Sequence, residues 1–195
     1  MKLVLATRND HKVEEFSALL APHEVVALPP EVELPPETGT TFADNALGKA
    51  RAAAAALGAV AIADDSGIES AALGGRPGVY SARFAGADAT DQENLDKLLA
   101  EAPAGSPLAY VCVIALVDPA APGDDGVLLF EGRCTGTLAA QPRGDGGFGY
   151  DPAFLPDDEI PPPAGRTMAE LTPAEKGAIS HRGRAAALLR GHLGG

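Results

Sequence analysis

The sequence predicts an α/β domain with a mixed β-sheet, and three observations support this class. Strand-like apolar runs alternate with helical patterns over residues 1–63, an order typical of parallel strands joined by helices. Two β-rich runs, Leu108 to Val117 and Val127 to Leu138, then follow each other and indicate an antiparallel pair. The 195 residues show no internal repeat and no clear boundary, so we expect a single domain, with or without a lobe.

The first strand is predicted at Leu3 to Ala6, and a helix follows from near Asp10. A loop between a strand and a helix N-terminus can bind an anion, because backbone N–H groups and the helix dipole point there. Thr7, Asn9 and Lys12 would add a hydroxyl, an amide and a cation. The alternative is that Asn9 or Asp10 only caps the helix.

The next segments are a possible strand, Glu24 to Leu28, and a loop over residues 29–38 that is rich in proline and glutamate. Thr41 to Asp44 resembles a capping box with Asp in place of Glu, and it opens an alanine-rich helix that ends near Leu57. The helix carries Asn45 and Lys49 four residues apart, and hence on one face. They could form a ligand site or simply the solvated side of the helix.

Two adjacent acids follow the apolar run Ala59 to Ala63, which reads as a buried strand that ends at a site. Asp64 and Asp65 repel each other there, so their burial is costly unless a cation or hydrogen-bond donors share the charge. A hard divalent metal such as Mg²⁺ prefers carboxylate oxygen. In the alternative interpretation the two acids cap a strand-to-turn junction.

Glycine-rich segments and further helix starts fill the rest of the chain. Thr90 to Glu93 is a second capping box, for a helix that ends near Ala100. Residues 144–152 hold four glycines around Phe148 and Tyr150, and they could lay a ring against a flat ligand or act as a hinge.

A third capping box, Thr172 to Glu175, opens a short helix that carries Lys176. Ser180 is expected to cap the last helix, with His181 and Arg182 in its first turn. Cations oppose the helix dipole at this end, which argues for a ligand-binding role. The alternative is that His181 is simply solvated.

Composition excludes several classes of function. The net charge of −12 and pI near 4.6 argue against a nucleic-acid or anionic-membrane surface. Cys112 and Cys134 lie in apolar or β-like runs and are expected to be buried thiols. No signal peptide or membrane-spanning run is evident, so a soluble cytoplasmic protein is expected.

The quoted residues resemble the non-canonical purine nucleoside triphosphate pyrophosphatases, also called inosine/xanthosine triphosphate pyrophosphatases, over nearly the whole chain. The matching blocks are Ala6-Thr7-x-Asn9-x-x-Lys12, Glu37-Thr38-Gly39-x-Thr41-Phe42-x-x-Asn45-Ala46-x-x-Lys49-Ala50, Ala63-Asp64-Asp65-Ser66-Gly67 through Tyr80-Ser81-Ala82-Arg83, Gly146-Gly147-Phe148-Gly149-Tyr150-Asp151-Pro152, and Lys176-x-x-Ile179-Ser180-His181-Arg182.

The resemblance implies an elongated single α/β domain over residues 1–195, with a long mixed sheet, two lobes and a central cleft. It also implies a homodimer that uses Mg²⁺ to hydrolyse inosine, deoxyinosine and xanthosine triphosphates to the monophosphate and pyrophosphate. Two alternatives are a pyrophosphatase of the related septum-inhibitor-like family and a nucleotide-binding protein without turnover.

The resemblance also implies roles for individual residues. Asp65 would be the catalytic base, and Glu37 and Asp65 the metal ligands. Substrate would be bound by Thr7, Arg8, Asn9, Asp10, His11, Lys12, Lys49, Ser66, Phe148, Gly149, Tyr150, Asp151, Lys176, His181 and Arg182. Asp44 stands where the family commonly has Glu, and its shorter side chain could weaken a site that this carboxylate reaches.

Hypoxanthine and xanthine present a keto acceptor at position 6, where adenine presents an amino donor. Lys176 or Arg182 pointing at that position would favour the keto bases and oppose adenine. Guanine shares the keto group, so its rejection would need an additional device, such as an unsatisfied 2-amino group in the pocket.

Overall fold

Strand pairing confirms the predicted α/β class with a mixed sheet. The computed structural model describes residues 1–121, 123–158 and 161–194. Six strands form one sheet in the order β2-β1-β3-β4-β5-β6. β1 pairs in parallel with β2 and β3, whereas β5 and β6 pair antiparallel. The strands are β1 (Lys2–Leu5), β2 (Glu24–Ala27), β3 (Ala61–Ser70), β4 (Pro107–Val117), β5 (Val127–Leu138) and β6 (Phe154–Pro156).

The helices lie close to the predicted positions. They are α1 (Asp10–Leu19), α2 (Phe42–Leu57), α3 (Asp91–Glu101), α4 (Pro173–Ile179) and α5 (His181–His192). Short 3-10 turns occur at Ala71–Leu73, Gly78–Arg83, Gly123–Gly126, Asp151–Ala153 and Met168–Glu170. No helix in the described ranges is long and apolar enough to cross a bilayer.

Two compact units can be distinguished within the chain. Unit 1 comprises Met1–Asp65, Cys112–Gly132 and Arg182–Gly195, and unit 2 comprises Ser66–Val111 and Arg133–His181. β3, β4 and β5 each contribute residues to both units.

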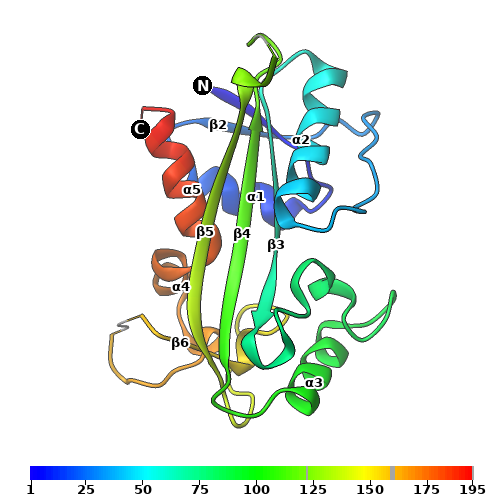
Figure 1. Cartoon of the computed structure of the whole chain (residues 1–195). Helices are drawn as coiled ribbons and strands as arrows, with labels where there is room; N and C mark the ends of the chain where they lie inside the picture. The colour runs from blue at the N-terminus through cyan, green and yellow to red at the C-terminus, as the bar shows by residue number, and fades with distance from the viewer. Residues whose placement is uncertain (122, 159–160, 195) are drawn as a thin grey trace. The chain divides into compact units, whose positions relative to one another are not determined.

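Unit 1 is a sheet with helices on both faces. Leu3 and Leu5 of β1 pack with Phe16 of α1 and Leu189 of α5, all of them fully buried. The alternate residue Val4 points to the other face, where α2 packs. Figure 1 shows α2 on one side of these strands and α5 on the other. Because both faces are covered, the strands are apolar at successive positions rather than alternating.

α2 packs closely because its buried positions are alanines. Ala46, Ala50, Ala53 and Ala54 are at most 1% exposed, and they lie on small residues of β1, β3 and β4. The helix is capped by Thr41, whose Oγ1 accepts a hydrogen bond from the Asp44 backbone N–H at 3.1 Å.

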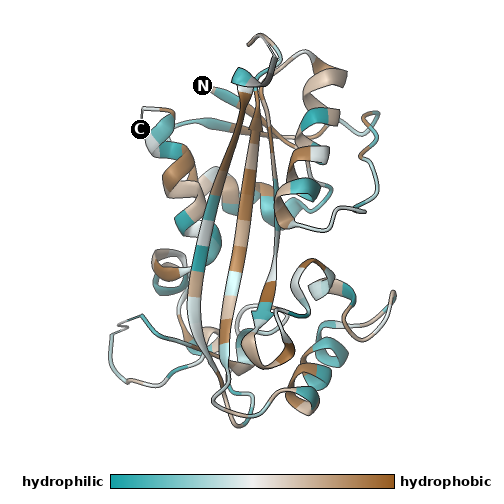
Figure 2. Cartoon of the chain, viewed as in Figure 1, coloured by the Kyte–Doolittle hydropathy of each residue, from teal (hydrophilic) through white to brown (hydrophobic). Residues whose placement is uncertain are grey.

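Unit 2 has its own core, formed by α3, parts of β3, β4 and β5, and the segments around β6 and Met168–Glu170. Its largest fully buried side chains include Leu98, Phe154 and Met168. Hydrophobic residues run along much of β4, which contributes to the cores of both units (Figure 2). Both cysteines are buried free thiols, as predicted.

The prediction that the third strand ends at Ala63 is wrong. β3 continues through both acids to Ser70, so Asp64 and Asp65 lie inside a strand rather than at its mouth. The strand need not end there because side chains from elsewhere in unit 1 satisfy the two carboxylates. β6, with only three residues, is too short to show a pattern and was not predicted.

The predicted helix starts are mostly confirmed. Reciprocal capping boxes form between Thr90 and Glu93 and between Thr172 and Glu175. α5 begins at His181, directly after Ser180. β4 and β5 are sheet neighbours, as expected, and in the loop between them residue 122 lies outside the described part.

Candidate functional site

The loop between β1 and α1 is folded by its own side chains. Asn9 Oδ1 accepts hydrogen bonds from the backbone N–H groups of His11 at 3.0 Å and Lys12 at 3.4 Å. Thr7 Oγ1 in turn accepts from the Asn9 N–H at 3.2 Å. Asn9 is therefore the N-cap of α1, and its side chain already accepts two of the N–H groups at the helix start.

Arg8 ties this loop to the proline-rich loop that follows β2. Its guanidinium donates to the carbonyl oxygens of Leu28, Pro29 and Pro30 at 3.1–3.3 Å, and also to that of Val32. The proline-rich loop leads to Glu37. Through these bonds Arg8 fixes the path of the chain toward that carboxylate.

Asp64 lies at the centre of a buried cluster of charges. Lys12 Nζ contacts both of its carboxylate oxygens at 2.9 Å, and Arg182 Nε lies 3.6 Å from Oδ2. Arg182 also donates to Glu15 of α1 at 2.9 Å. The cluster thus joins α1, β3 and α5.

This cluster keeps Asp64 ionised. Burial alone would raise the pKa of Asp64, but the opposite charges of Lys12 and Arg182 lower it from 3.8 to about 2. Burial lowers the pKa of Arg182, and Asp64 and Glu15 more than reverse that shift. Cys112 stays a protonated thiol, because burial raises its pKa.

Asp65, on the other side of β3, is held by α2. Asn45 Nδ2 donates to Asp65 Oδ2 at 2.8 Å, and Asn45 Oδ1 accepts from the Gly39 N–H at 2.8 Å. A Cβ at Gly39 would overlap Asn45 Oδ1, so only glycine allows this close approach.

Lys49, one turn further along α2, binds the carboxylate of Glu37. Its Nζ donates to Glu37 Oε1 and, at 2.8 Å, to the backbone carbonyl of Asp64. Asn45 and Lys49 are only 5% and 9% exposed, so the alternative of a solvated helix face is wrong. One buried face of α2 therefore holds both Asp65 and Glu37.

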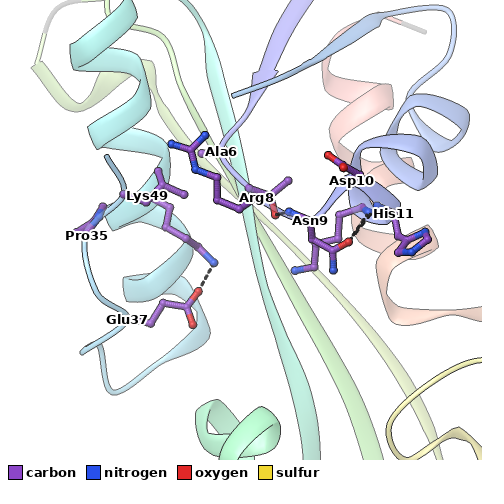
Figure 3. A pocket seen from close by; sticks show the side chains of 11 residues that line it. Ala6, Arg8, Asn9, Asp10, His11, Pro35, Glu37 and Lys49 are labelled. Atoms are coloured by element: carbon purple, nitrogen blue, oxygen red, sulfur yellow. Dashed lines mark hydrogen bonds and ion pairs between the residues drawn. The ribbon is translucent and has the colours of Figure 1, made fainter. Parts of the chain in front are cut away.

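A cavity of about 780 Å³ opens beside these groups. Figure 3 shows Glu37 and Lys49 facing each other at one side of it, with Asn9, Asp10 and His11 at the α1 side. The cavity is lined by Ala6, Thr7, Arg8, Asn9, Asp10, His11, Lys12, Leu34, Pro35, Glu37 and Lys49. A smaller cavity of about 300 Å³ includes Asp44 together with Glu37, Asn45 and Lys49.

No group of three or more His, Cys, Asp or Glu side chains that could hold a metal ion occurs among the described residues. The carboxylates that line the two unit 1 cavities are those of Asp10, Glu37 and Asp44, and Asp65 is held nearby by Asn45, which lines the smaller cavity. Carboxylate oxygen suits a hard divalent cation, and Mg²⁺ commonly keeps several waters when only one or two carboxylates bind it.

Unit 2 contains a second pocket, of about 140 Å³, built around the glycine-rich segment. Asp151, which is 2% exposed, accepts three hydrogen bonds there. Its Oδ2 accepts from the Phe148 N–H at 2.9 Å and from Lys176 Nζ at 2.5 Å, and its Oδ1 accepts from the Tyr110 hydroxyl at 3.1 Å.

The segment that carries Phe148 needs glycine. Gly147 has φ +74, and a Cβ there would overlap Asp151 Oδ2. Phe148 itself is 58% exposed, and Lys176 Nζ lies 4.6 Å from the centre of its ring. An exposed aromatic face beside a cation suits a flat, electron-rich ligand.

Six residues that line the unit 2 pocket were not among the predicted site residues: Gly67, Ile68, Ser81, Ala82, Asp91 and Tyr110. Tyr110 of β4 stacks on the His181 ring, with centroids 4.8 Å apart and planes 10° apart. Asp91 of α3 accepts from the Gly149 N–H at 2.9 Å. The sequence around Tyr110 predicts only a strand, and Asp91 lies in a predicted helix start. Neither residue therefore gave a sign that it would line a binding pocket.

The predicted residues therefore fall into two groups. Unit 1 brings the loop from Thr7 to Lys12 together with Glu37 and Lys49 around one cavity. Asp65 does not line that cavity and is held by Asn45, on the same helix as Lys49. The unit 2 pocket is lined by Ser66, Gly67, Ile68, Ser81, Ala82, Asp91, Tyr110, Phe148, Gly149, Tyr150 and His181. His181 is buried in this pocket rather than solvated, whereas Arg182 is bound to Asp64 and Glu15 in unit 1.

Comparison with known proteins gives consistent matches over almost the whole chain. A model of the Ham1 family matches residues 3–192. A protein from Yersinia pseudotuberculosis named dITP/XTP pyrophosphatase is 49% identical, covering 96% of this chain and 95% of that protein. A protein of the same name from Mycobacterium bovis is 47% identical, covering 96% and 93%.

Solved structures agree with these matches. A HAM1 protein from Coxiella burnetii has a TM-score of 0.86 and 41% identity, covering 99% of this chain and 98% of that one. The Ham1 protein of Staphylococcus aureus has a TM-score of 0.82 and 38% identity, with the same coverage of the two chains.

Proposed function

Because the chain belongs to the Ham1 family, we propose that it hydrolyses inosine, deoxyinosine and xanthosine triphosphates to the monophosphate and pyrophosphate. Relatives of 47–49% identity over most of their length are named dITP/XTP pyrophosphatase. The observation that carries the proposal is that one buried face of α2 holds two carboxylates, Glu37 through Lys49 and Asp65 through Asn45. Glu37 and Lys49 also line a cavity that is large enough for a nucleotide phosphate chain.

Glu37 and Asp65 are the residues that we propose to hold Mg²⁺. When bound, the ion would neutralise charge on the phosphate oxygens and lower the pKa of a water. Lys49 neutralises Glu37 in this structure. We therefore expect Lys49 to turn toward a phosphate oxygen when Glu37 binds the metal.

The side chains around the cavity supply the remaining chemistry. Water must attack the phosphorus nearest the ribose, and Asp65 is proposed to orient that water and accept its proton. Lys12 and Lys49 would neutralise negative charge that develops on the bridging and leaving oxygens. Little covalent help from the protein is needed in such a reaction.

The unit 2 pocket is the proposed site of the base. Lys176 is a donor that can meet the keto oxygen at position 6 of hypoxanthine or xanthine, and Phe148 offers a ring face. We assign recognition of the keto group to Lys176, because it lies beside the exposed Phe148 ring and keeps further N–H donors while it binds Asp151. Arg182, by contrast, is only 4% exposed and binds Asp64 and Glu15 in unit 1. Adenine would meet this donor with an amino group and is expected to be rejected.

A substrate panel with product identification tests the function. Inosine triphosphate with Mg²⁺ should give inosine monophosphate and pyrophosphate, whereas orthophosphate with the diphosphate would refute the proposal. Comparable rates on thymidine or uridine triphosphate would favour the septum-inhibitor-like class. Absence of any turnover would favour a nucleotide-binding protein.

The Asp65→Asn variant tests the proposed base. Loss of the proton acceptor should lower kcat by roughly 10²-fold to 10⁴-fold, because that is the usual contribution of a positioned acid or base. Asp96→Asn on α3 is the matched control, since Asp96 is exposed and accepts a hydrogen bond from Gln92 of its own helix. Equal rates for Asp65→Asn and the wild type would exclude Asp65 as the base.

We further propose that two chains form a homodimer and that the protein acts on the cytoplasmic nucleotide pool. Both proposals rest on the family resemblance and on the chemistry of the substrate. Sedimentation velocity would distinguish a dimer from a monomer.

A further inference from the structure

Tyr110 connects two of the residues that we place around the base. Its hydroxyl donates to Asp151 Oδ1, and its ring lies parallel to that of His181. Phe154 packs against the same tyrosine, with ring centroids 4.7 Å apart, and Tyr110 is 7% exposed. The side chain is thus fixed on several sides while it lines the pocket.

Asp151 in turn holds two groups at the edge of the proposed base site. Its Oδ2 holds the ammonium of Lys176 and the backbone N–H of Phe148, while Tyr110 holds Oδ1. Rotation about the Cβ–Cγ bond would move both carboxylate oxygens, so the hydroxyl of Tyr110 at Oδ1 adds a third restraint to the two at Oδ2. Tyr110 thereby helps to fix the direction in which Asp151 presents Lys176.

Tyr110 is chemically suited to this task. Burial, followed by the nearby charge of Asp151, raises the pKa of Tyr110 well above its ordinary value. The hydroxyl therefore keeps its proton and acts as the donor toward the carboxylate. A hydrogen bond to a charged, buried acceptor is among the stronger ones in proteins.

We propose that Tyr110 is a positioning residue for base recognition, which acts through Asp151 on Lys176 and through ring stacking on His181. This inference rests on the proposed function. It predicts that Tyr110 contributes to affinity and to discrimination between keto and amino purines. It predicts no direct contribution to the hydrolysis step.

The Tyr110→Phe variant tests the proposal, because it keeps the stacked ring and removes only the hydroxyl. We expect KM for inosine triphosphate to rise roughly tenfold, the value of about one charge-assisted hydrogen bond, with kcat within about twofold of wild type. The preference for inosine over adenosine triphosphate, as a ratio of kcat/KM values, should fall. Tyr80→Phe is the control, since Tyr80 is 54% exposed and outside the pocket.

A double-variant cycle tests the route through Asp151. If Tyr110 acts through this carboxylate, Tyr110→Phe should add little to the loss caused by Asp151→Asn. Fully additive losses would overturn the proposed route. An unchanged KM in Tyr110→Phe, or a fall in kcat at constant KM, would overturn the inference itself.

Direct binding separates this inference from the proposed function. Calorimetric titration with inosine monophosphate measures base recognition without turnover, and its Kd should also rise roughly tenfold in Tyr110→Phe. If the wild type binds inosine monophosphate but hydrolyses no triphosphate, the proposed function fails and the binding comparison still decides the role of Tyr110. Equal affinities of the two proteins, or no binding by the wild type, would refute that role.

Discussion

At the scale of single residues, two buried carboxylates of this protein are each neutralised by cations. Asp64 is paired with Lys12 and Arg182, and Asp151 is paired with Lys176 and two neutral donors. An unpaired buried charge would be strongly destabilising. Lys12 and Lys176 therefore have protein partners that a nucleotide would have to compete with or join.

Gly147 gives a test at this scale. Gly147→Ala adds a Cβ that overlaps Asp151 Oδ2, and it also forces a left-handed backbone at φ +74. We expect a loss of about 1–2 kcal/mol in the free energy of unfolding and weaker binding of inosine monophosphate. Urea unfolding and calorimetric titration measure the two effects.

Gly58→Ala is the control for backbone strain alone. Gly58 ends α2 with φ +58, and a Cβ there would meet nothing within 4 Å. Gly58→Ala should lose about as much unfolding free energy as Gly147→Ala. It should bind inosine monophosphate with the affinity of the wild type. Equal binding by Gly147→Ala and Gly58→Ala would contradict the assigned role of Gly147.

At the scale of elements, local signals in the sequence predicted the helices better than the site. The capping boxes at Thr90 and Thr172 depend on residues three apart, and both form as predicted. The end of β3 could not be predicted, because it depends on Lys12, Asn45 and Arg182, which are distant in the sequence. Those partners satisfy the two acids and allow the strand to continue.

In the candidate site, too, features set by local sequence could be predicted, and features set by distant residues could not. The carboxylates and lysines were recognisable from residue type and from the family blocks. The role of Tyr110 was not, because nothing in an apolar run shows which residue will face Asp151.

α2 gives a test at the element scale. Ala50 is fully buried in the core of unit 1, and Ala55 is exposed on the same helix. Ala50→Leu should cost about 1–3 kcal/mol of unfolding free energy, because the close packing against β-strands has no room for three more carbons. Ala55→Leu should change stability by less than about 0.5 kcal/mol, since both residues are good helix formers. Equal urea midpoints would show that α2 packs less tightly than described.

At the scale of the whole molecule, the change of unfolding free energy with pH is set by the difference between the numbers of protons bound by the unfolded and folded chains. The chain has 27 Asp and Glu residues, and most exposed ones contribute little. Asp64 differs because it is buried and its pKa is lowered to about 2. Glu175 has a similarly low pKa, caused first by its hydrogen bonds from Arg166, but it is partly exposed and more open to screening by salt.

Removal of Lys12 should therefore change the acid limb of the stability curve. The folded pKa of Asp64 lies below the unfolded value of 3.8, so its contribution is present above about pH 4 and is lost as the pH falls toward 2. The size of this contribution is about 2 kcal/mol. In Lys12→Gln the pKa of Asp64 should rise toward 3.8. Its unfolding free energy should then lie below that of the wild type by up to about 2 kcal/mol at pH 5–7, and the two curves should converge toward pH 2.

Lys2→Gln is the matched control for this prediction. Lys2 is an exposed lysine that lies 3.8 Å from Glu24, and a surface pair of this kind contributes little. Urea unfolding at several pH values between 2 and 7 should give parallel curves for Lys2→Gln and the wild type. A Lys12→Gln curve that stays parallel to the wild type down to pH 2 would show that Lys12 does not set the ionisation of Asp64. Asp64 would then owe its low pKa to Arg182, the other cation beside its carboxylate.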